Sequence, residues 1–508
     1  MSSIEPMITP AAMQHALSVY NTLTGQRTPF EPQTPPFVGM YVCGPTLYKE
    51  AHLGHARSAI NFDVIQRYLK HIGYQVRYVR NVTDVGHLTD DADEGIDKVS
   101  QQAQVEKRTP MEIVQRYGYS YRRDMDRLNV QPPSIEPQAS GHIIEQISTI
   151  QEIKRAGLAY ATDGSVYFDM DAYMRKHTYG RLSGHIPAQA KAGTRPLAGQ
   201  AQKRNELDFA LWKKAGSAHS MRWSSPWGVG FPGWHIACTA MSTKYLGKSF
   251  DIHGGGMDLI FPHHECEWVQ AQAAYQTPPA KYWLHNNVIT IAGQKMSKSK
   301  GNAITLAQLF SGMHPNLTQA YSPMALRLFV LQAHYRSLLH FSEEALRAAH
   351  NGYRKLMHGL RVVHELAHAP VSTADNPDKA LVAKLAKIFQ DCYAAMNDDF
   401  NTAKVLSALF ELLKYIHALK QHQLSCSALG PAIFQQLQVT YRCFVEDILG
   451  LKEDLQIPPE ALLHIVRGLY QDAKAHRQYD RVDHIRADLK RLGITLQDTP
   501  TGIDWYYS

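Results

Sequence analysis

Two short segments, far apart along the chain, carry side chains that suit nucleotide binding. Residues 52–55 read His-Leu-Gly-His, and two histidines three positions apart lie on one face of a helix. Residues 295–300 read Lys-Met-Ser-Lys-Ser-Lys and lie between Gly293 and Gly301. Either segment alone is a weak pattern. Together, in this order, they predict activation of a carboxylic acid by ATP.

The histidine segment is expected at the start of a helix, where free main-chain amides and the helix dipole favour a bound anion. There, His52 and His55 could donate to phosphate oxygens as charge develops on them. Gly54 lacks the Cβ that would keep a flat base away. Histidines at helix starts are as often caps or packing residues, and this alternative stays open for the segment on its own.

The lysine segment is expected to form a loop that closes over pyrophosphate, because its cations and flanking glycines combine charge with freedom to move. Lys298 is the predicted main contact and Lys295 the second. The alternative is a solvated basic turn, which is the usual meaning of a run of charges.

A glycine run is the third feature of the nucleotide-binding kind. Its residues are His253, Gly254, Gly255 and Gly256, with Asp258 close behind. Glycines let a backbone approach adenine and ribose closely, although such a run is weak evidence when it stands alone.

Side chains of the kinds that bind zinc lie near these segments. His263 and Glu267 are four positions apart in an expected helix, so they stack on the same face. Cys238 lies upstream, and Cys43 ends an expected strand. Two thiols, an imidazole and a carboxylate form a donor set that suits zinc.

The spacing of these four residues does not by itself specify a metal site. The chain has no Cys-x-x-Cys motif, and the ligands must converge from three distant segments. His264 and Cys266 are rival ligands that helix geometry cannot exclude. Buried free cysteines and a capped helix are the alternative interpretation.

The elements that would position these groups begin with a buried strand over residues 38–42. Helical spacing follows from about 52 to 68, and residues 75–79 are expected as the next strand. Strand, turn, helix and strand make a parallel crossover unit, so we expect an α/β fold with a doubly wound, Rossmann-type parallel sheet. Strand-like patterns return at 250–252 and 287–291.

The sequence predicts three domains. Residues 1–325 would form the Rossmann-type catalytic domain, with an insertion at about 120–215 where prolines and glycines interrupt the pattern. Residues 326–455 carry long amphipathic patterns typical of a helical bundle. Residues 456–508 would form a small C-terminal domain with one helix over 461–492 and a short strand.

Length and composition limit the class of protein. The chain has 508 residues, 44% hydrophobic and 19% charged, with six cysteines and no apolar run long enough to span a membrane. We therefore expect a soluble, cytoplasmic protein that has no disulfide framework and does not bind membranes. The formal net charge of +7 is compatible with a polyanionic partner without requiring one.

The motifs taken together resemble those of cysteinyl-tRNA synthetases, a family of class I aminoacyl-tRNA synthetases, over nearly the whole chain. In one-letter code, the matching stretches are YVCGPT at 41–46, HLGHAR at 52–57, NVTD at 81–84, GWHIAC at 233–238, FDIHGGG at 250–256, FPHHE at 261–265, KMSKSKGN at 295–302, HYRS at 334–337 and DDFNT at 398–402. Departures from the family pattern include Leu53 for the usual isoleucine and Cys266 for an expected asparagine.

This resemblance implies a role for each candidate residue. Zinc would be held by Cys43, Cys238, His263 and Glu267, which decides against His264. Thr83 and Trp234 would line the amino acid pocket. ATP would be bound by Pro45, Gly54, His253, Gly254, Gly255, Asp258 and Lys298, with His52, His55 and Lys295 acting beside Lys298 in catalysis.

The resemblance also implies the reaction. ATP and L-cysteine would form cysteinyl-adenylate, with magnesium accompanying ATP, and the adenylate would acylate tRNA(Cys), which the residues after 325 would grip by its stem and anticodon. A shape-selective pocket separates cysteine from serine by only about 10–200-fold. A thiolate is a far better zinc ligand than a hydroxyl, so zinc would select the substrate. A monomer is expected.

Three other functions stay open on the sequence. A related ligase could join activated cysteine to an amino sugar, although such relatives lack a long C-terminal region. A tRNA-binding protein without activity would not need the histidine and lysine segments. A zinc hydrolase with Glu265 or Glu267 as its base would not explain the lysine loop.

Overall fold

Four parallel strands form the central sheet of the first part of the chain. They are β3 (Phe37–Val42), β4 (Gln75–Arg80), β10 (Phe250–Gly256) and β11 (Ala280–Asn286), in the order β11-β10-β3-β4. Every neighbouring pair in this sheet is parallel. A parallel sheet needs helices on both faces, which is why β10 reads as a run of buried residues. The predicted doubly wound α/β fold is confirmed.

A computed structural model describes residues 16–88, 97–185, 202–216, 219–291, 293–296, 301–367, 377–454, 459–491, 494–499 and 502–507. Contacts between residues divide the chain into two compact units, Met1–Lys452 and Glu453–Ser508.

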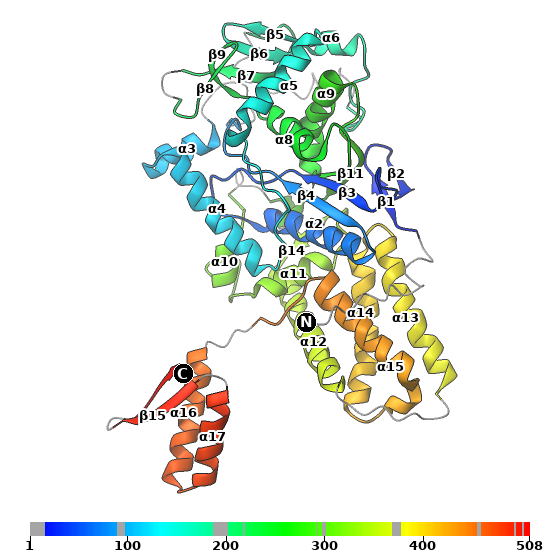
Figure 1. The fold of residues 1–508 in the computed structure, drawn as a ribbon, viewed down its shortest axis with the longest axis vertical. Coiled ribbons are helices and arrows are strands. Elements are labelled where there is room, and N and C mark those ends of the chain that lie inside the picture. The colour runs from blue at the N-terminus through cyan, green and yellow to red at the C-terminus, as the bar shows by residue number, and fades with distance from the viewer. Residues whose placement is uncertain are drawn as a thin grey trace. The chain divides into compact units, whose positions relative to one another are not determined.

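Helices pack on both faces of the parallel sheet (Figure 1). Helix α2 (Leu53–His71) connects β3 to β4 on one face, and α8 (Ile236–Leu246) and α9 (Glu265–Tyr275) lie on the other. Because the four strands run the same way, their carboxyl ends meet at one edge of the sheet. The histidine segment and Cys43 stand at this edge, since α2 begins there.

An antiparallel sheet of five strands is inserted between β4 and β10 in the chain. Its order is β5-β6-β7-β9-β8, formed by Ala159–Thr162, Ser165–Phe168, Phe209–Lys214, Gly228–Pro232 and Trp223–Ser225. Helices α3 (Lys98–Glu106), α4 (Pro110–Arg127), α5 (Ile143–Arg155) and α6 (Met170–Met174) accompany it in sequence. The sheet runs to Pro232, beyond the end predicted for the insertion.

Short elements surround the lysine segment. A three-stranded sheet has the order β13-β12-β14, with strands Gln294–Lys295, Ile289–Ile291 and Leu339–Phe341. Helices α10 (Leu306–Ser311) and α11 (Pro323–Leu331) lie between its strands in sequence. The hairpin of β1 (Ser18–Asn21) and β2 (Gln26–Pro29) opens the described chain.

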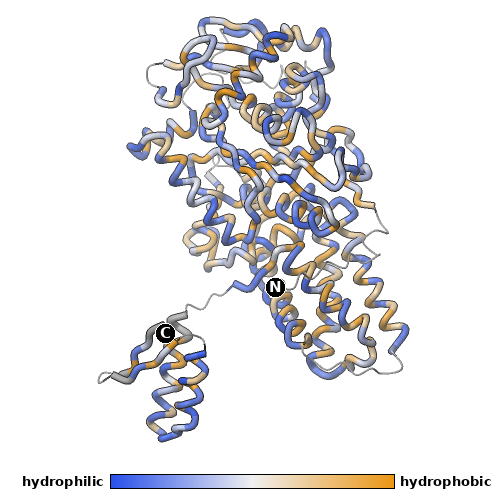
Figure 2. The backbone as a smooth tube through the Cα atoms, in the orientation of Figure 1, coloured by the Kyte–Doolittle hydropathy of each residue, from blue (hydrophilic) through white to orange (hydrophobic). Residues whose placement is uncertain are grey.

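Four long helices follow this region. They are α12 (Glu343–Leu366), α13 (Lys379–Asn397), α14 (Thr402–Lys420) and α15 (Cys426–Arg442). Each alternates hydrophobic and hydrophilic stretches along its length (Figure 2), and the buried stripes, such as Leu409 and Leu412 of α14, pack between the helices. A π-helical turn over Cys443–Ile448 continues α15 and packs on α2.

The second unit contains two helices where the sequence predicted one. Helices α16 (Pro459–Ala475) and α17 (Tyr479–Arg491) pack together beside a hairpin of β15 (Ile494–Thr499) and β16 (Gly502–Tyr507). The prediction of a single helix over 461–492 is wrong because Arg477 adopts a left-handed backbone, with φ of 56°. A residue in that conformation ends a right-handed helix.

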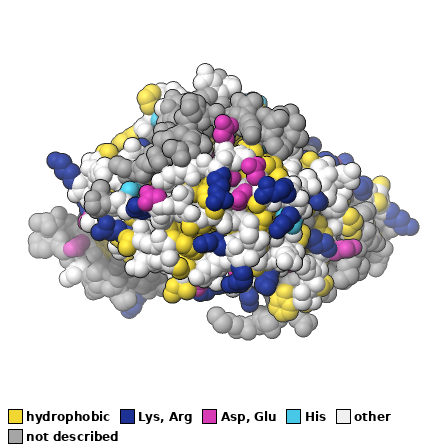
Figure 3. All heavy atoms as spheres, turned by 90° about the horizontal axis from the view of Figure 1, so that it is seen from above, with side chains coloured by type: hydrophobic (Ala, Val, Ile, Leu, Met, Phe, Trp, Pro, Cys, Tyr) yellow, Lys and Arg dark blue, Asp and Glu magenta, His cyan; other side chains and the backbone are white. Residues whose placement is uncertain are grey.

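None of the described helices combines the length and the apolar character that crossing a membrane requires. Lys and Arg side chains on the face in Figure 3 are interspersed with Asp and Glu side chains. The net positive charge of the chain is therefore not gathered into one uniform patch on that face.

Candidate active site

A cavity of about 640 Å³ opens at the carboxyl edge of the parallel sheet. Its walls come from the ends of β3, β4 and β10, from the first turns of α2, and from residues 286–289. The predicted site residues that line it are Cys43, Pro45, His52, Gly54, His55, Thr83, Trp234, Cys238, Asp258 and His263. The parallel sheet thus brings together residues from most of the predicted motifs.

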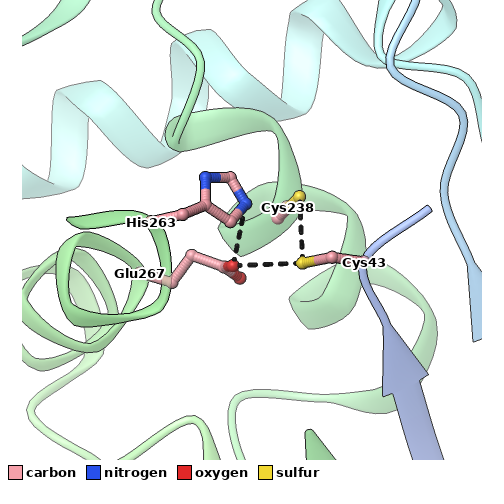
Figure 4. A group of neighbouring side chains, drawn as sticks. All are labelled: Cys43, Cys238, His263 and Glu267. Carbon is pink, nitrogen blue, oxygen red and sulfur yellow. Dashed lines mark hydrogen bonds and ion pairs between the residues drawn. The ribbon is translucent and has the colours of Figure 1, made fainter. Parts of the chain in front are cut away.

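Four metal-type side chains converge at one wall of this cavity (Figure 4). Cys43 contributes its Sγ from the end of β3, 3.9 Å from Sγ of Cys238 on α8 and 3.4 Å from Oε1 of Glu267 on α9. Nε2 of His263 lies 3.2 Å from the same Oε1. The ligand atoms of all four lie within 4.8 Å of one another, which is the spacing of donors around a single ion.

A second set of donors overlaps the first. It keeps Cys43 and Glu267 but replaces the others with His253 and His264. Cys238 and His263 line the cavity, whereas His253 and His264 are fully buried and are not among its lining residues. An ion held by the first set would face the cavity. Cys266, the other rival that the sequence left open, is in neither set of described residues.

Histidines in and behind the cluster are hydrogen-bonded to one another in pairs. Nδ1 of His263 lies 2.8 Å from Nδ1 of His235, and Nδ1 of His264 lies 2.8 Å from Nε2 of His285. Burial lowers the pKa of His263 and that of His285 to about 3. A neutral imidazole has the lone pair that a metal ligand needs. His235 and His285 were not among the site residues predicted from the sequence.

Burial affects the thiol of Cys43 in the opposite direction. Burial, and then the neighbouring Cys238, raise the pKa of the Cys43 thiol well above its ordinary value. Two thiols placed side by side in this environment lose their protons when a cation binds them. The donor set and its burial therefore fit a divalent, thiophilic metal.

The two histidines at the start of α2 hold a defined orientation. His52 is the N-cap residue, and its Nδ1 accepts a hydrogen bond from the amide of Gly54 at 3.1 Å. Nδ1 of His55 accepts from the amide of His52 at 3.2 Å, and the two rings stack with centroids 3.9 Å apart. A neutral ring that accepts at Nδ1 carries its proton at Nε2. Each ring is thus a donor at Nε2, on a residue that lines the cavity.

Trp234 lies beside the metal-type cluster, and Thr83 lines the same cavity. The Trp234 ring stacks on His87, with centroids 4.0 Å apart and planes 8° from parallel, and lies 4.7 Å from the ring of His263. His87 also lines the cavity, and its Nδ1 lies 2.7 Å from the hydroxyl of Thr46. The spacing of His87 from the motifs carries no signal, so its place at the site was not predicted from the sequence.

The glycine run packs closely against side chains of the protein. His253, Gly254 and Gly255 belong to β10, and they are not among the described residues that line the cavity. A Cβ on Gly254 would lie 2.3 Å from the Phe62 ring, and one on Gly255 would lie 2.8 Å from the His264 ring. These glycines therefore make room for neighbouring side chains of the protein. Gly256 and Asp258 of this segment line the cavity, and the contacts of His253, Gly254 and Gly255 with ATP stay predictions.

His253 contacts the metal-type cluster through Glu267. Its Nε2 lies 2.9 Å from Oε2 of Glu267, and its ring stacks on Trp283 with centroids 4.3 Å apart. A partner of this kind orients a carboxylate ligand.

Gly54 also packs closely within the protein. A Cβ there would lie 3.0 Å from Cε1 of His52, so the glycine leaves space for that ring. From the sequence, the missing Cβ of Gly54 was expected to make room for the base of a nucleotide.

The lysine segment lies partly outside the described residues. β13 ends at Lys295, whose side chain is not described, and Lys298 falls in the undescribed stretch 297–300. Gly293 and Gly301 have φ of 76° and 67°, which glycine adopts without strain. Met296 lines the cavity between them, so the segment starts at the cavity wall. The roles of Lys295 and Lys298 stay predictions.

Solved structures share the fold of the chain. The methionyl-tRNA synthetase of Mycobacterium tuberculosis in complex with methionyl-adenylate superimposes with a TM-score of 0.58 and 14% identity, covering 85% of this chain and 93% of the other. A family model for the tRNA synthetases class I (C) catalytic domain matches residues 29–351, and a DALR domain model matches residues 391–453. Fold and motifs together define a class I tRNA synthetase.

Curated relatives narrow the class. Cysteine–tRNA ligase of Cytophaga hutchinsonii is 55% identical over 492 residues, covering 97% of this chain and 99% of the relative. The cysteine–tRNA ligases of Porphyromonas gingivalis and Deinococcus radiodurans are 50% and 45% identical and cover at least 96% of both chains. The chain belongs to the cysteine–tRNA ligase family.

Proposed function

We propose that the chain ligates L-cysteine to tRNA(Cys) in two steps within one cavity. In the first, the carboxylate of cysteine attacks the α-phosphate of magnesium-bound ATP, which gives cysteinyl-adenylate and pyrophosphate. In the second, a hydroxyl of the terminal ribose of the tRNA attacks the adenylate carbonyl, and AMP leaves. The observation that carries this proposal is that three of the four metal-type donors and the two histidines at the start of α2 line the same cavity.

The phosphates of ATP lie, in this proposal, at the N-terminus of α2. His52 and His55 donate from Nε2 to phosphate oxygens, and Lys295 and Lys298 reach the departing pyrophosphate from the loop. These groups act by position and charge, because no covalent enzyme intermediate is needed. Pro45, Gly54 and Asp258 line the cavity where ATP would lie.

In this proposal, L-cysteine occupies the part of the cavity beside the metal-type cluster, away from the phosphates at α2. Thr83 and Trp234 line the cavity there, and the ring of Trp234 stacks on His87 and also lies 4.7 Å from the ring of His263. An aromatic ring packed against its neighbours in this way gives a pocket of defined shape. We assign Thr83 and Trp234 to cysteine binding.

Zinc is the metal that the donor set fits best. Cys43, Cys238, His263 and Glu267 would hold it, with His235 orienting His263 and His253 orienting Glu267. When bound there, zinc would supply a soft cation that a thiolate binds far better than a hydroxyl does. Cys43 and Cys238 would keep that cation at the wall where the substrate thiol arrives.

The tRNA would contact the chain beyond the catalytic region. We propose that residues 1–325 form the catalytic domain and that residues 326–455 bind the tRNA stem. Residues 456–508 would bind the anticodon. Helix α17 carries Arg481, Arg486, Lys490 and Arg491, cations of the kind that bind an RNA backbone. We expect a monomer to be the active species.

Cysteine-dependent exchange between ATP and labelled pyrophosphate tests the first step, and charging of tRNA(Cys) transcript tests the second. We expect both, with serine at least about 10³-fold weaker than cysteine, which exceeds what shape alone provides. Metal analysis of the same preparation should find zinc. Exchange without charging would instead support a ligase for another acceptor, such as an amino sugar. Absence of exchange in zinc-loaded protein would refute the proposal.

A further inference from the structure

Asp399 is a buried carboxylate at the turn between α13 and α14. It is fully buried, and its backbone adopts a left-handed conformation with φ of 61°, which is uncommon for a residue other than glycine. Oδ1 accepts from the amide of Tyr20 at 2.9 Å and from the hydroxyl of Tyr335 at 2.7 Å. Oδ2 accepts from Nε of Arg336 at 2.7 Å. The surrounding structure therefore holds this carboxylate firmly.

Two of these donors belong to residues 334–337, which we name the strap. The strap lies between α11 and β14 in the chain, so it joins the parallel-sheet region to the helices. Nε2 of His334, also in the strap, lies 3.0 Å from the main-chain oxygen of Asp399. The amide of Asn287 donates to the main-chain oxygen of Tyr335 at 2.9 Å. Asp399 thus fixes the strap from one side, and the cavity wall contacts it from the other.

Arg57 grips the strap from the start of α2. Its Nη2 donates to the main-chain oxygens of Tyr335 and Ser337, and its Nη1 donates to that of Val288 at 2.6 Å. The side chain is 1% exposed. Its hydrogen bonds to described residues go to main-chain oxygens, and the strap supplies two of these three acceptors.

Arg57 itself, and Val288 among the residues it holds, line the cavity of the nucleotide site. Arg57 lies two positions after His55 on α2, and Val288 lines the cavity directly before β12. β12 pairs with β13, the strand that leads into the lysine segment, and with β14, which follows the strap. A displacement of the strap would therefore shift the positions of both His52 and His55 and the lysine segment.

We infer that Asp399 is a positioning residue for the nucleotide site: through the strap and Arg57 it sets the first turns of α2 and the cavity wall. The inference rests on the proposed function, because the site it positions is the one that binds ATP there. Asp399 itself lies outside the set of residues that line the cavity. It lies in the helical region to which we assign tRNA binding, so it ties that region to the catalytic groups.

The substitution Asp399→Asn isolates this role. An asparagine presents one oxygen and one NH₂ group, whereas every neighbour of the carboxylate described above is a donor. Either Arg336 or the pair of Tyr20 and Tyr335 would then face a donor. The volume stays nearly unchanged, so the strap would shift without the loss of a side chain.

Asp398 provides a matched control one position away. Its side chain is 30% exposed and forms ion pairs with Arg27 and Lys404 at the surface. Exposed pairs of this kind contribute little to stability. Asp398→Asn therefore makes the same chemical change in the same turn without touching the strap.

The experiment measures cysteine-dependent ATP–pyrophosphate exchange per active site, counted by the burst of adenylate formation. We expect Asp399→Asn to lower kcat at least about 10-fold, since misplacement of reacting groups by about 1 Å can cost about 100-fold. Asp398→Asn should stay within about twofold of the wild type. A purely structural role would reduce the number of active sites while kcat per site stays unchanged, and that result would overturn the inference.

A double-mutant cycle tests the route through Arg57, which Asp399 does not touch. Arg57→Lys keeps the charge but loses the planar fork that holds several oxygens at once. If Asp399 acts through Arg57, the double variant should be less than about twofold slower than the slower single variant. Losses in kcat that multiply would overturn the route. A wild type that fails to exchange would refute the proposed function instead, so the two failures are distinguishable.

Discussion

The sulfur of Cys43 lies 3.4 Å from Oε1 of Glu267, although the two residues are 224 positions apart in the chain. One stands at the carboxyl end of a sheet strand, and the other stands on a helix that follows the neighbouring strand. Their meeting depends on β3 and β10 being adjacent and parallel. Changes at this wall of the cavity should therefore affect metal binding and substrate choice together.

Replacing Cys238 by alanine should remove zinc and cysteine activation in parallel. The change removes one of the two thiolates, which are the softest donors of the set, so the three donors that remain should hold zinc more weakly. We expect the zinc content per chain and the cysteine-dependent exchange to fall together, measured by metal analysis and exchange on the same sample. Cys266→Ala is the control, since this cysteine is in neither donor set and should keep its zinc. A zinc-free Cys238→Ala protein with normal exchange would contradict the assignment.

The substitution His52→Asn should separate the capping role of this residue from its catalytic role. An asparagine at the N-cap can still accept from the amide of Gly54, so the thermal midpoint should stay near that of the wild type. It has no donor in the place of Nε2, and kcat for exchange should fall about 100-fold or more. Thermal unfolding and exchange rates test this together. Equal losses of stability and activity would mean that His52 is only a cap.

Gly44→Ala should damage the cavity wall. A Cβ at this position would lie 1.6 Å from the main-chain oxygen of Asn81. This clash can be relieved only if the backbone moves. We expect a loss of stability of about 3 kcal/mol or more, as severe overpacking produces, measured by urea unfolding. Gly141→Ala is the matched control, because a Cβ at that position would have nothing within 4 Å of it. A Gly44→Ala protein as stable as this control would contradict the close packing of Gly44 on Asn81.

Asp124 should make stability fall as the pH rises. Both carboxylate oxygens are buried without a hydrogen-bond partner among the described residues, and burial raises the pKa of Asp124 from 3.8 to about 6. The folded state therefore binds the proton more tightly than the unfolded state, and stability is lost as the pH rises from about 4 to about 6.

Asp124→Asn should accordingly stabilise the protein at pH 8, by at most about 3 kcal/mol for a shift of about two pKa units. The gain should shrink at pH 4.5, where the wild-type carboxyl is largely protonated. Urea unfolding of both proteins at the two pH values measures the difference. A gain that is equal at both pH values would mean that the titration of Asp124 does not cause it.

Much of the sheet could be read from local patterns, because a strand and a helix each have their own hydrophobic period. The strand ending at Cys43 and the helix beginning near His52 were predicted within a few residues. The break between α16 and α17 was not, since Arg477 offers no glycine or proline to mark it. The packing of Gly254 on Phe62 and of Gly255 on His264 was not predicted for a related reason: a missing Cβ gives room, but the sequence does not say to which neighbour.

By itself, the sequence determined the chemical inventory: thiols, imidazoles and carboxylates suited to zinc, histidines and lysines suited to phosphates, and motifs in the order of a known family. Residue types and short-range spacing are local properties, so they can be read from the sequence alone. Only the tertiary structure decided which donors face the cavity, that His87 supports Trp234, and that Asp399 reaches α2 through Arg57. Those relationships join residues that are distant in sequence, and they exist only because packing of the sheet and helices brings the segments within hydrogen-bond distance.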